Sequence, residues 1–170
     1  MQEEFSVKDL CFSAIIAALY AALTLLFQPI SFGAVQFRIS EALTLLPVLF
    51  PQAIPGLVIG CFLSNLIGSA TAWDVVFGTL ATLGAALWTF SLRKNVWLAA
   101  IPPVACNGVV VGLVLHLTLG FPLFETVLTV ALGEAVVVYV LGVPMVKALS
   151  KNPPTEVTGV TNADGKIRSR

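Results

Sequence analysis

Glu134 is the residue whose type and position most clearly suggest chemistry, because it stands inside a long apolar run. A charge near the centre of a bilayer costs at least about 2.5 kcal/mol, so a carboxylate there must face protein or water and needs a donor. Glu134 could pair with another span, bind a donor group of a ligand, or carry a proton, and these alternatives stay open. Asn107, at comparable depth on the preceding span, is a candidate co-ligand or a partner in an interhelical hydrogen bond.

A second group of candidates lies in the polar insert at residues 36–41, between two apolar stretches. Arg38 and Glu41 are three residues apart within it. One structural interpretation is that Ser40 is the N-cap of a helix and that Glu41 suits the positive end of that helix. The other is that Arg38 and Glu41 belong to a binding site.

Aromatic and amide side chains add further candidates. Trp73 and Phe77, with Phe32 and Phe37, could supply stacking faces for a flat heterocycle. Trp73 and the adjacent Asp74 could equally be an interfacial anchor and the start of a helix. Asn65 and His116 face the same choice between ligand binding and a structural role, whereas we expect Glu125 to be a solvated acid in the first turn of a helix.

The composition places these residues in a membrane protein. Hydrophobic residues make up 58% of the chain and charged residues 11%, and the mean hydropathy is +0.96. A soluble core of this size would need a charged surface that the chain lacks. A net charge of zero argues against nucleic-acid binding. Cys11, Cys61 and Cys106 have no paired spacing, and one histidine without a Cys/His cluster predicts neither a metal nor a cofactor.

Six apolar segments with tight connections account for residues 1–150, so we expect an all-α integral membrane domain of six transmembrane helices. We expect Pro102 and Pro103 to kink the fifth span. Residues 151–170 are rich in Pro, Thr, Gly and charge, and predict a disordered C-terminal tail. The expected spans are residues 10–27, 42–50 (opening at Glu41), 56–68, 73–92, 96–119 and 123–149.

The basic residues predict the orientation of these spans, because cytoplasmic loops carry an excess of Lys and Arg. With both termini cytoplasmic, Arg38 is the one basic residue on the outer side, which suggests a role other than topology. Arg38 and Glu41 then lie at the outer mouth and Glu134 near mid-membrane. This arrangement suits a pocket loaded from outside better than a continuous pore. The basic residues on the inner side are Lys8, Arg93, Lys94, Lys147, Lys151, Lys166, Arg168 and Arg170.

A stripe of small residues runs along the first span, where Ala14, Ala18 and Ala22 repeat at a spacing of four. Such a stripe allows another helix to pack closely. The partner could be another span of this chain or a separate subunit, and the spacing does not decide between them.

Four sequence blocks carry a resemblance to a known family: residues 37–44, 50–57, 60–66 and 74–83. They resemble the QueT family, whose members are similar to substrate-binding S components of energy-coupling factor (ECF) transporters for queuosine precursors. The resemblance covers about residues 7–150. It implies a six-helix S-component-like bundle in a prokaryotic cell membrane, without enzymatic activity. It also implies that the alanine stripe docks on a transmembrane coupling subunit driven by two ATPases, in agreement with the absence of a P-loop from this chain.

The ligand implied by the resemblance is a 7-deazaguanine, whose guanine-like edge offers two neighbouring N–H donors to a carboxylate. We expect Glu134 or Glu41 to accept from this edge, Asn107, Asn65 or Arg38 to fix the base, and Trp73 to stack on it. The second acid could meet an aminomethyl group of the precursor. The competing interpretations are an S component for another vitamin-like solute, a stand-alone secondary transporter or channel, and a small membrane enzyme. The enzyme is the weakest of these, because the chain offers no nucleophile–base pair and no metal triad.

Overall fold

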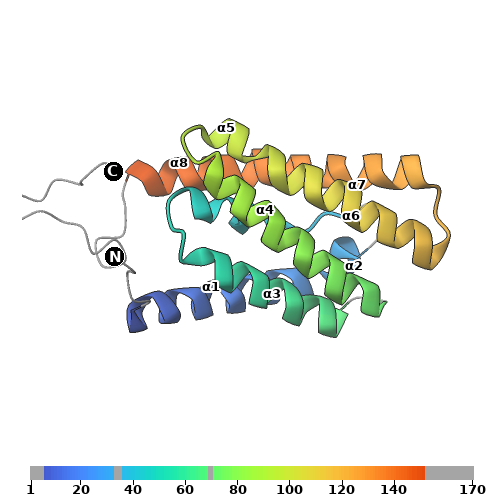
Figure 1. Cartoon of the computed structure of the whole chain (residues 1–170), viewed down its shortest axis with the longest axis horizontal. Coiled ribbons are helices and arrows are strands. Elements are labelled where there is room, and N and C mark those ends of the chain that lie inside the picture. The colour runs from blue at the N-terminus through green and yellow to red at the C-terminus, as the bar shows by residue number, and fades with distance from the viewer. Residues whose placement is uncertain (1–5, 33–35, 69–70, 152–170) are drawn as a thin grey trace, which may run out of the picture.

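The protein is a bundle of long, roughly parallel and antiparallel helices in a computed structural model that describes residues 6–32, 36–68 and 71–151 (Figure 1). Within these ranges all regular structure is helical. The expected tail beyond Lys151 lies outside the described residues. The helical elements, in chain order, are α1 (Val7–Leu26), α2 (Gln28–Ser31), the 3-10 helix η1 (Ile39–Val48), α3 (Ala53–Gly68), the π-helix η2 (Asp74–Gly78), α4 (Thr79–Ser91), α5 (Val96–Ala99), α6 (Ile101–Leu119), α7 (Leu123–Val137), the π-helix η3 (Val138–Gly142) and α8 (Val143–Lys151).

All six expected apolar segments are helical, which confirms the all-α prediction for the described part of the chain. Four of them are long and apolar enough to cross a membrane: Val7–Leu26, Asp74–Ser91, Val96–Leu119 and Leu123–Lys151. The other two, Ile39–Val48 and Ala53–Gly68, are shorter apolar helices. The number of membrane crossings therefore stays a prediction.

Helix ends follow from local sequence. Ser6 and Asp9 form a capping box at the start of α1. Gly120 ends α6 with a positive φ of 73°, a conformation that glycine adopts without a Cβ clash. Pro102 and Pro103 lie in the first turn of α6, where a missing N–H is tolerated. The helix is interrupted just before them, at Ala100. The expected kink inside a fifth helix is therefore a boundary between α5 and α6.

The second apolar segment also differs from expectation. It is a 3-10 helix whose N-cap residue is Arg38, and no side chain caps it. The expectation that Ser40 is an N-cap is wrong, since Ser40 already lies inside η1 and its hydroxyl contacts Thr24 Oγ1 of α1 at 2.6 Å. This hydroxyl pair joins η1 to α1.

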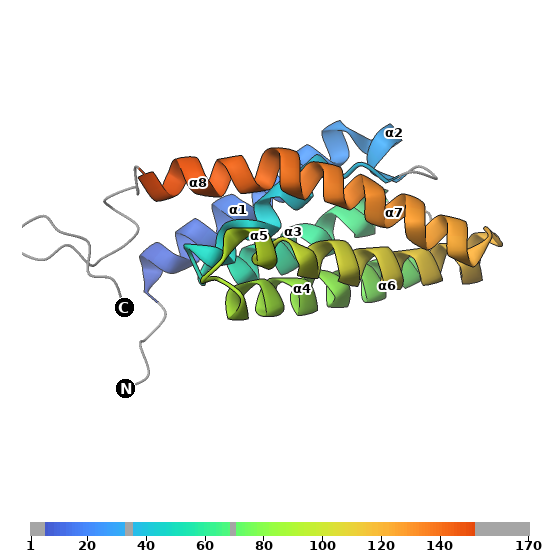
Figure 2. The same cartoon turned by 90° about the horizontal axis from the view of Figure 1, so that it is seen from above.

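The start of α1, the α4–α5 turn and the end of α8 lie at one end of the bundle, and the α6–α7 turn lies at the other, in both views (Figures 1 and 2). α1 packs closely on α3: a Cβ added at Gly56 would lie 2.3 Å from the carbonyl oxygen of Ser13. Segment η1 lies between α1 on one side and η3 and α8 on the other, and its buried Leu45 and Leu46 join the apolar cores on those two sides. This central position of η1 places its polar residues inside the protein.

Candidate functional site: two buried carboxylates and an arginine

Glu134 and Asn107 meet inside the bundle. Glu134 lies near the end of α7 and is 2% exposed, and Asn107 lies in the first half of α6 and is also buried. Asn107 Nδ2 donates to Glu134 Oε1 at 2.9 Å. The other carboxylate oxygen, Oε2, has no hydrogen-bond partner among the described residues. The expected similar depth of Asn107 and Glu134 is confirmed, and one acceptor atom of Glu134 is left over.

Glu41 repeats this arrangement from the opposite side of the bundle. It is fully buried on η1, and the hydroxyl of Tyr20 on α1 donates to its Oε1 in a short hydrogen bond. Glu41 Oε2 has no partner among the described residues. Tyr20 was missed by the sequence analysis, although a lone tyrosine within an apolar helix is a usable signal, because a buried phenolic hydroxyl normally finds a partner.

Arg38 is the third buried ionisable residue of this region, three positions before Glu41 and two after Gln36, whose backbone passes Gly133 of α7. It is 2% exposed, its Nε donates to the carbonyl oxygen of Ser31 at 3.2 Å, and its guanidinium carbon is 4.9 Å from the centroid of the Phe32 ring. Both Arg38 and Glu41 are enclosed by protein, and their expected place at the outer mouth of the membrane domain stays a prediction.

Close backbone contacts explain why residues so distant in sequence share one region. A Cβ at Gly133 would lie 2.3 Å from the carbonyl oxygen of Gln36, so only glycine lets the segment before η1 cross α7 directly beside Glu134. On the other side, the hydroxyl pair of Thr24 and Ser40 holds η1 to α1. We call Tyr20, Arg38, Glu41, Asn107 and Glu134 the carboxylate cluster.

Asn65 and Asp74 form a separate polar contact. Asn65 Nδ2 donates to the backbone oxygen of Asp74 at 3.2 Å, and Asp74 Oδ2 accepts from the Thr71 hydroxyl at 2.9 Å. Both residues are buried. These bonds tie α3 to η2 and match a structural role for both side chains; their expected role in ligand binding stays a prediction.

The remaining candidates lie at the surface of the chain. Trp73 and Phe77 are 60% and 40% exposed and stack on each other, with ring centroids 5.6 Å apart. Among the described contacts, none joins either ring to the carboxylate cluster. His116 Nδ1 lies 2.6 Å from the backbone oxygen of Phe121, as expected for a satisfied histidine at a helix end. Glu125 is exposed in the first turn of α7.

The alanine stripe of α1 faces away from the bundle. Ala14, Ala18 and Ala22 are all exposed, whereas Ser13, Ala17, Tyr20 and Thr24 on the opposite side of α1 are buried. The stripe therefore does not pack against another described span of this chain. The same helix presents small residues outward and holds Glu41 inward.

Comparison with known proteins gives a family match. The profile of a family described as QueT transporter matches residues 10–151. The Queuosine precursor transporter QueT of Lactococcus lactis subsp. cremoris (strain MG1363) is 42% identical over 77 residues, which is 44% of this chain and 45% of that protein. The aligned stretch thus spans less than half of the relative. No solved structure matches the chain.

Proposed function

Because this chain belongs to the QueT transporter family, we propose that it is the substrate-binding S component of an ECF transporter and takes up a 7-deazaguanine precursor of queuosine. The observation that carries this proposal is the pair of buried carboxylates, Glu41 and Glu134. Each has one oxygen bonded by its own partner and the other without a partner among the described residues. A buried acceptor without a donor is costly, and a ligand donor would relieve that cost.

The chemistry of a 7-deazaguanine is complementary to this cluster. The guanine-like edge carries a ring N–H and an exocyclic amine, both donors, next to a carbonyl acceptor. Glu134 accepts from the two donors, Asn107 orients it, and the guanidinium of Arg38 serves the carbonyl. Glu41 is then available for an aminomethyl group. A solute without N–H donors would leave the two carboxylates unsatisfied, so the cluster favours a donor-rich heterocycle.

The alanine stripe supports the proposed assembly. Its three exposed alanines offer a flat surface for close helix packing outside this chain. In the proposal this surface docks on the transmembrane coupling subunit, and two ATPase subunits bound to that subunit supply the energy. This chain has no P-loop of its own for that task.

The charge distribution supports a topology with both termini cytoplasmic. The start of α1, the α4–α5 turn and α8 lie at one end of the bundle (Figure 1). The basic residues of those segments are Lys8, Arg93, Lys94, Lys147 and Lys151. We place this end in the cytoplasm of a prokaryotic cell, with six crossings of the cell membrane. The carboxylate cluster is then loaded from outside, after movement of the segments that bury it.

Calorimetric titration of the detergent-purified chain tests the substrate. We expect saturable one-to-one binding of a 7-deazaguanine precursor in preference to guanine and to unrelated vitamins. Glu134→Gln should weaken this binding about tenfold to a hundredfold, since a hydrogen bond to a charged group contributes about 1.5–3 kcal/mol. Glu125→Gln removes the same charge from an exposed site and should leave the affinity unchanged. Equal affinity of the Glu134→Gln and Glu125→Gln proteins would remove Glu134 from the site.

Reconstitution separates the S component from a stand-alone transporter. Vesicles containing this chain alone should bind the precursor without accumulating it, and accumulation should require the coupling subunit, the ATPases and ATP. Accumulation by the purified chain without these partners would overturn the S-component role while leaving the substrate assignment intact.

A further inference from the structure

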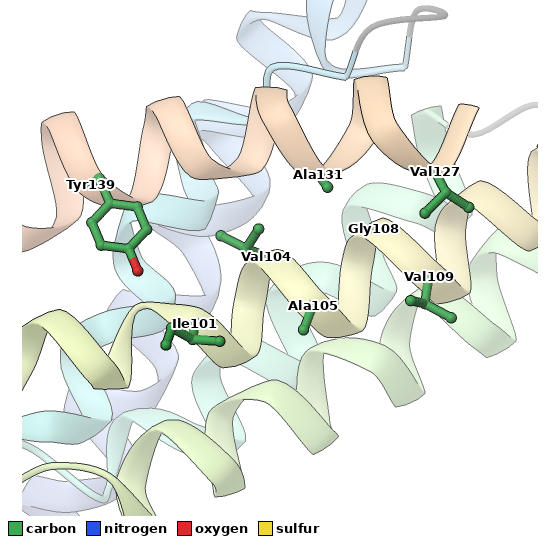
Figure 3. A pocket seen from close by; sticks show the side chains of 8 residues that line it. All are labelled: Ile101, Val104, Ala105, Gly108, Val109, Val127, Ala131 and Tyr139. Carbon is green, nitrogen blue, oxygen red and sulfur yellow. The ribbon is translucent and has the colours of Figure 1, made fainter. Parts of the chain in front are cut away.

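A hollow lies on the outside of the bundle, between α6 and α7, and is not part of the carboxylate cluster. It is a groove of about 180 Å³ with an almost wholly apolar lining (Figure 3). Side chains from both helices form its walls and Tyr139 stands at one end. The lining includes Val104, Ala105, Val109, Val127, Ala131 and Tyr139.

Two glycines of α6 mark a close approach to α7, and one of them, Gly108, belongs to the lining of the groove. A Cβ at Gly112 would lie 2.8 Å from Val127 Cα, and one at Gly108 would lie 2.9 Å from Ala131 Cβ. Ile101 and Tyr139 lie at the opposite end of the groove from Val127 (Figure 3). The groove therefore runs from the close contact of Gly108 with Ala131 toward Tyr139 of η3.

The Tyr139 end of the groove lies next to a basic hollow. Tyr139 stacks on Trp97 with centroids 6.0 Å apart, and its hydroxyl donates to the Trp97 backbone oxygen at 3.2 Å. On the far side of this aromatic pair is a hollow of about 450 Å³, whose lining includes Trp97, Val143, Lys147 and Lys151. Both charged residues in this lining are lysines. Lys147 Nζ lies 4.5 Å from the centroid of the Trp97 ring.

The same two stretches of helix line both hollows. The lining residues mostly recur at intervals of four, which places successive ones on adjacent turns. On α5 and α6 the series is Trp97, Ile101, Ala105 and Val109, and on α7, η3 and α8 it is Val127, Ala131, Tyr139, Val143, Lys147 and Lys151. From Val127 to Lys151 the helical rise is about 36 Å, comparable with the thickness of a bilayer's hydrocarbon core.

We propose that this groove is a binding site for an anionic phospholipid, with one acyl chain between α6 and α7 and the headgroup phosphate on Lys147 and Lys151. Lipid tails are as apolar as leucine, so a chain gains little hydrophobic free energy by moving from bilayer to groove. Selectivity must therefore come from the headgroup, and the lysine pair at one end favours a net negative charge. Trp97 lies where aromatic residues commonly mark the membrane interface. This inference does not depend on the proposed substrate.

Native mass spectrometry of the full chain, released from mixtures of phosphatidylglycerol and phosphatidylcholine with identical acyl chains, tests the site. We expect one phosphatidylglycerol to be retained in preference to phosphatidylcholine. Lys147→Gln with Lys151→Gln should weaken its retention roughly 25-fold, because each lysine near an anionic lipid contributes about fivefold. The matched control is Lys8→Gln with Lys94→Gln, which removes two exposed lysines at the same end of the bundle. It should change retention less than twofold.

A second pair of variants tests whether an acyl chain occupies the groove. Ala105→Phe fills the groove and should lower phosphatidylglycerol retention, whereas Leu87→Phe adds bulk at an exposed position of α4 and should not. Circular dichroism and the transition temperature establish that each variant is folded. Equal retention of the two lipids by the unmodified chain, or equal losses in the two double-lysine variants, would refute a specific site. Retention unchanged by Ala105→Phe would place the lipid outside the groove and overturn the proposal as stated.

Discussion

Tyr20→Phe is the substitution that most directly probes how the carboxylate cluster is organised. It removes one oxygen atom from a fully buried position and keeps the ring that packs in the core between α1 and α3. The lost atom is the hydroxyl that donates to Glu41 Oε1. Because Glu41 Oε2 has no partner among the described residues, the variant leaves the carboxylate without the hydrogen bond that Tyr20 donates.

Tyr20→Phe should change both the free energy of unfolding and the affinity for the precursor, but by different amounts. A hydrogen bond to a charged group contributes about 1.5–3 kcal/mol, and this should appear as a loss in the free energy of unfolding of the ligand-free protein. The bond is present with and without ligand, so most of its free energy cancels in the affinity. What remains is the cost of immobilising a Glu41 side chain that Tyr20 no longer holds, about 0.5–1.5 kcal/mol for such a side chain. We therefore expect precursor affinity to fall roughly twofold to tenfold.

Calorimetric titration of four proteins provides the assay: the unmodified chain, Tyr20→Phe, Glu41→Gln and the double variant. If Tyr20 acts through Glu41, its substitution should have little further effect once Glu41 is a glutamine, so the two effects should not add. Tyr139→Phe is the matched control, because this hydroxyl donates to the Trp97 backbone outside the cluster. Full additivity of Tyr20→Phe and Glu41→Gln, or an affinity loss as large in Tyr139→Phe, would refute this reasoning.

Three further predictions follow from packing and exposure. Gly56→Ala should destabilise the protein by several kcal/mol, because the added Cβ would lie 2.3 Å from a carbonyl oxygen of α1. In the control Gly84→Ala the added Cβ has no neighbour within 4 Å, so this variant should be neutral or stabilising. Thermal unfolding in detergent compares the two variants. Ala18→Trp should abolish ATP-dependent uptake in the reconstituted transporter and leave the affinity for the precursor, measured by calorimetry, unchanged. Loss of both uptake and precursor binding would contradict a separate docking surface. A membrane-permeant maleimide should label exposed Cys11 much faster than fully buried Cys61, and equal rates would contradict the packing of α3.

The apolar segments were predictable because hydropathy reports on burial and lipid contact regardless of helix type. The pairing of Asn107 with Glu134 was also accessible, since counting residues from the turn at residues 120–122 places both at similar depth on adjacent antiparallel helices. The residue types added the rest: a carboxylate in an apolar run needs a donor, and the amide of Asn107 is one.

Other features depend on contacts that the sequence does not display. Ten residues are too few for periodicity to separate a 3-10 helix from an α-helix, so neither the helix type of η1 nor the contact of Ser40 with Thr24 could be predicted from the pattern. The burial of Arg38 depends on Gly133, because the missing Cβ leaves room for the backbone of Gln36, two residues before Arg38. A glycine in an apolar helix has many possible reasons, and the sequence alone does not identify its neighbour.

Helix α1 is the element that relates the two proposed surfaces of this protein to each other. Its outward face carries the alanine stripe, and its inward face holds Glu41 through Tyr20 and η1 through the hydroxyl of Thr24. The separation of these faces is only the width of one helix, so a rotation or tilt of α1 caused by a partner on the stripe must move the donor on which Glu41 depends. A Glu41 side chain that Tyr20 no longer holds must be immobilised when the ligand binds, and this cost lowers the affinity. Partner docking and precursor affinity should therefore be linked, and by reciprocity the bound precursor must alter the affinity for the partner by the same factor.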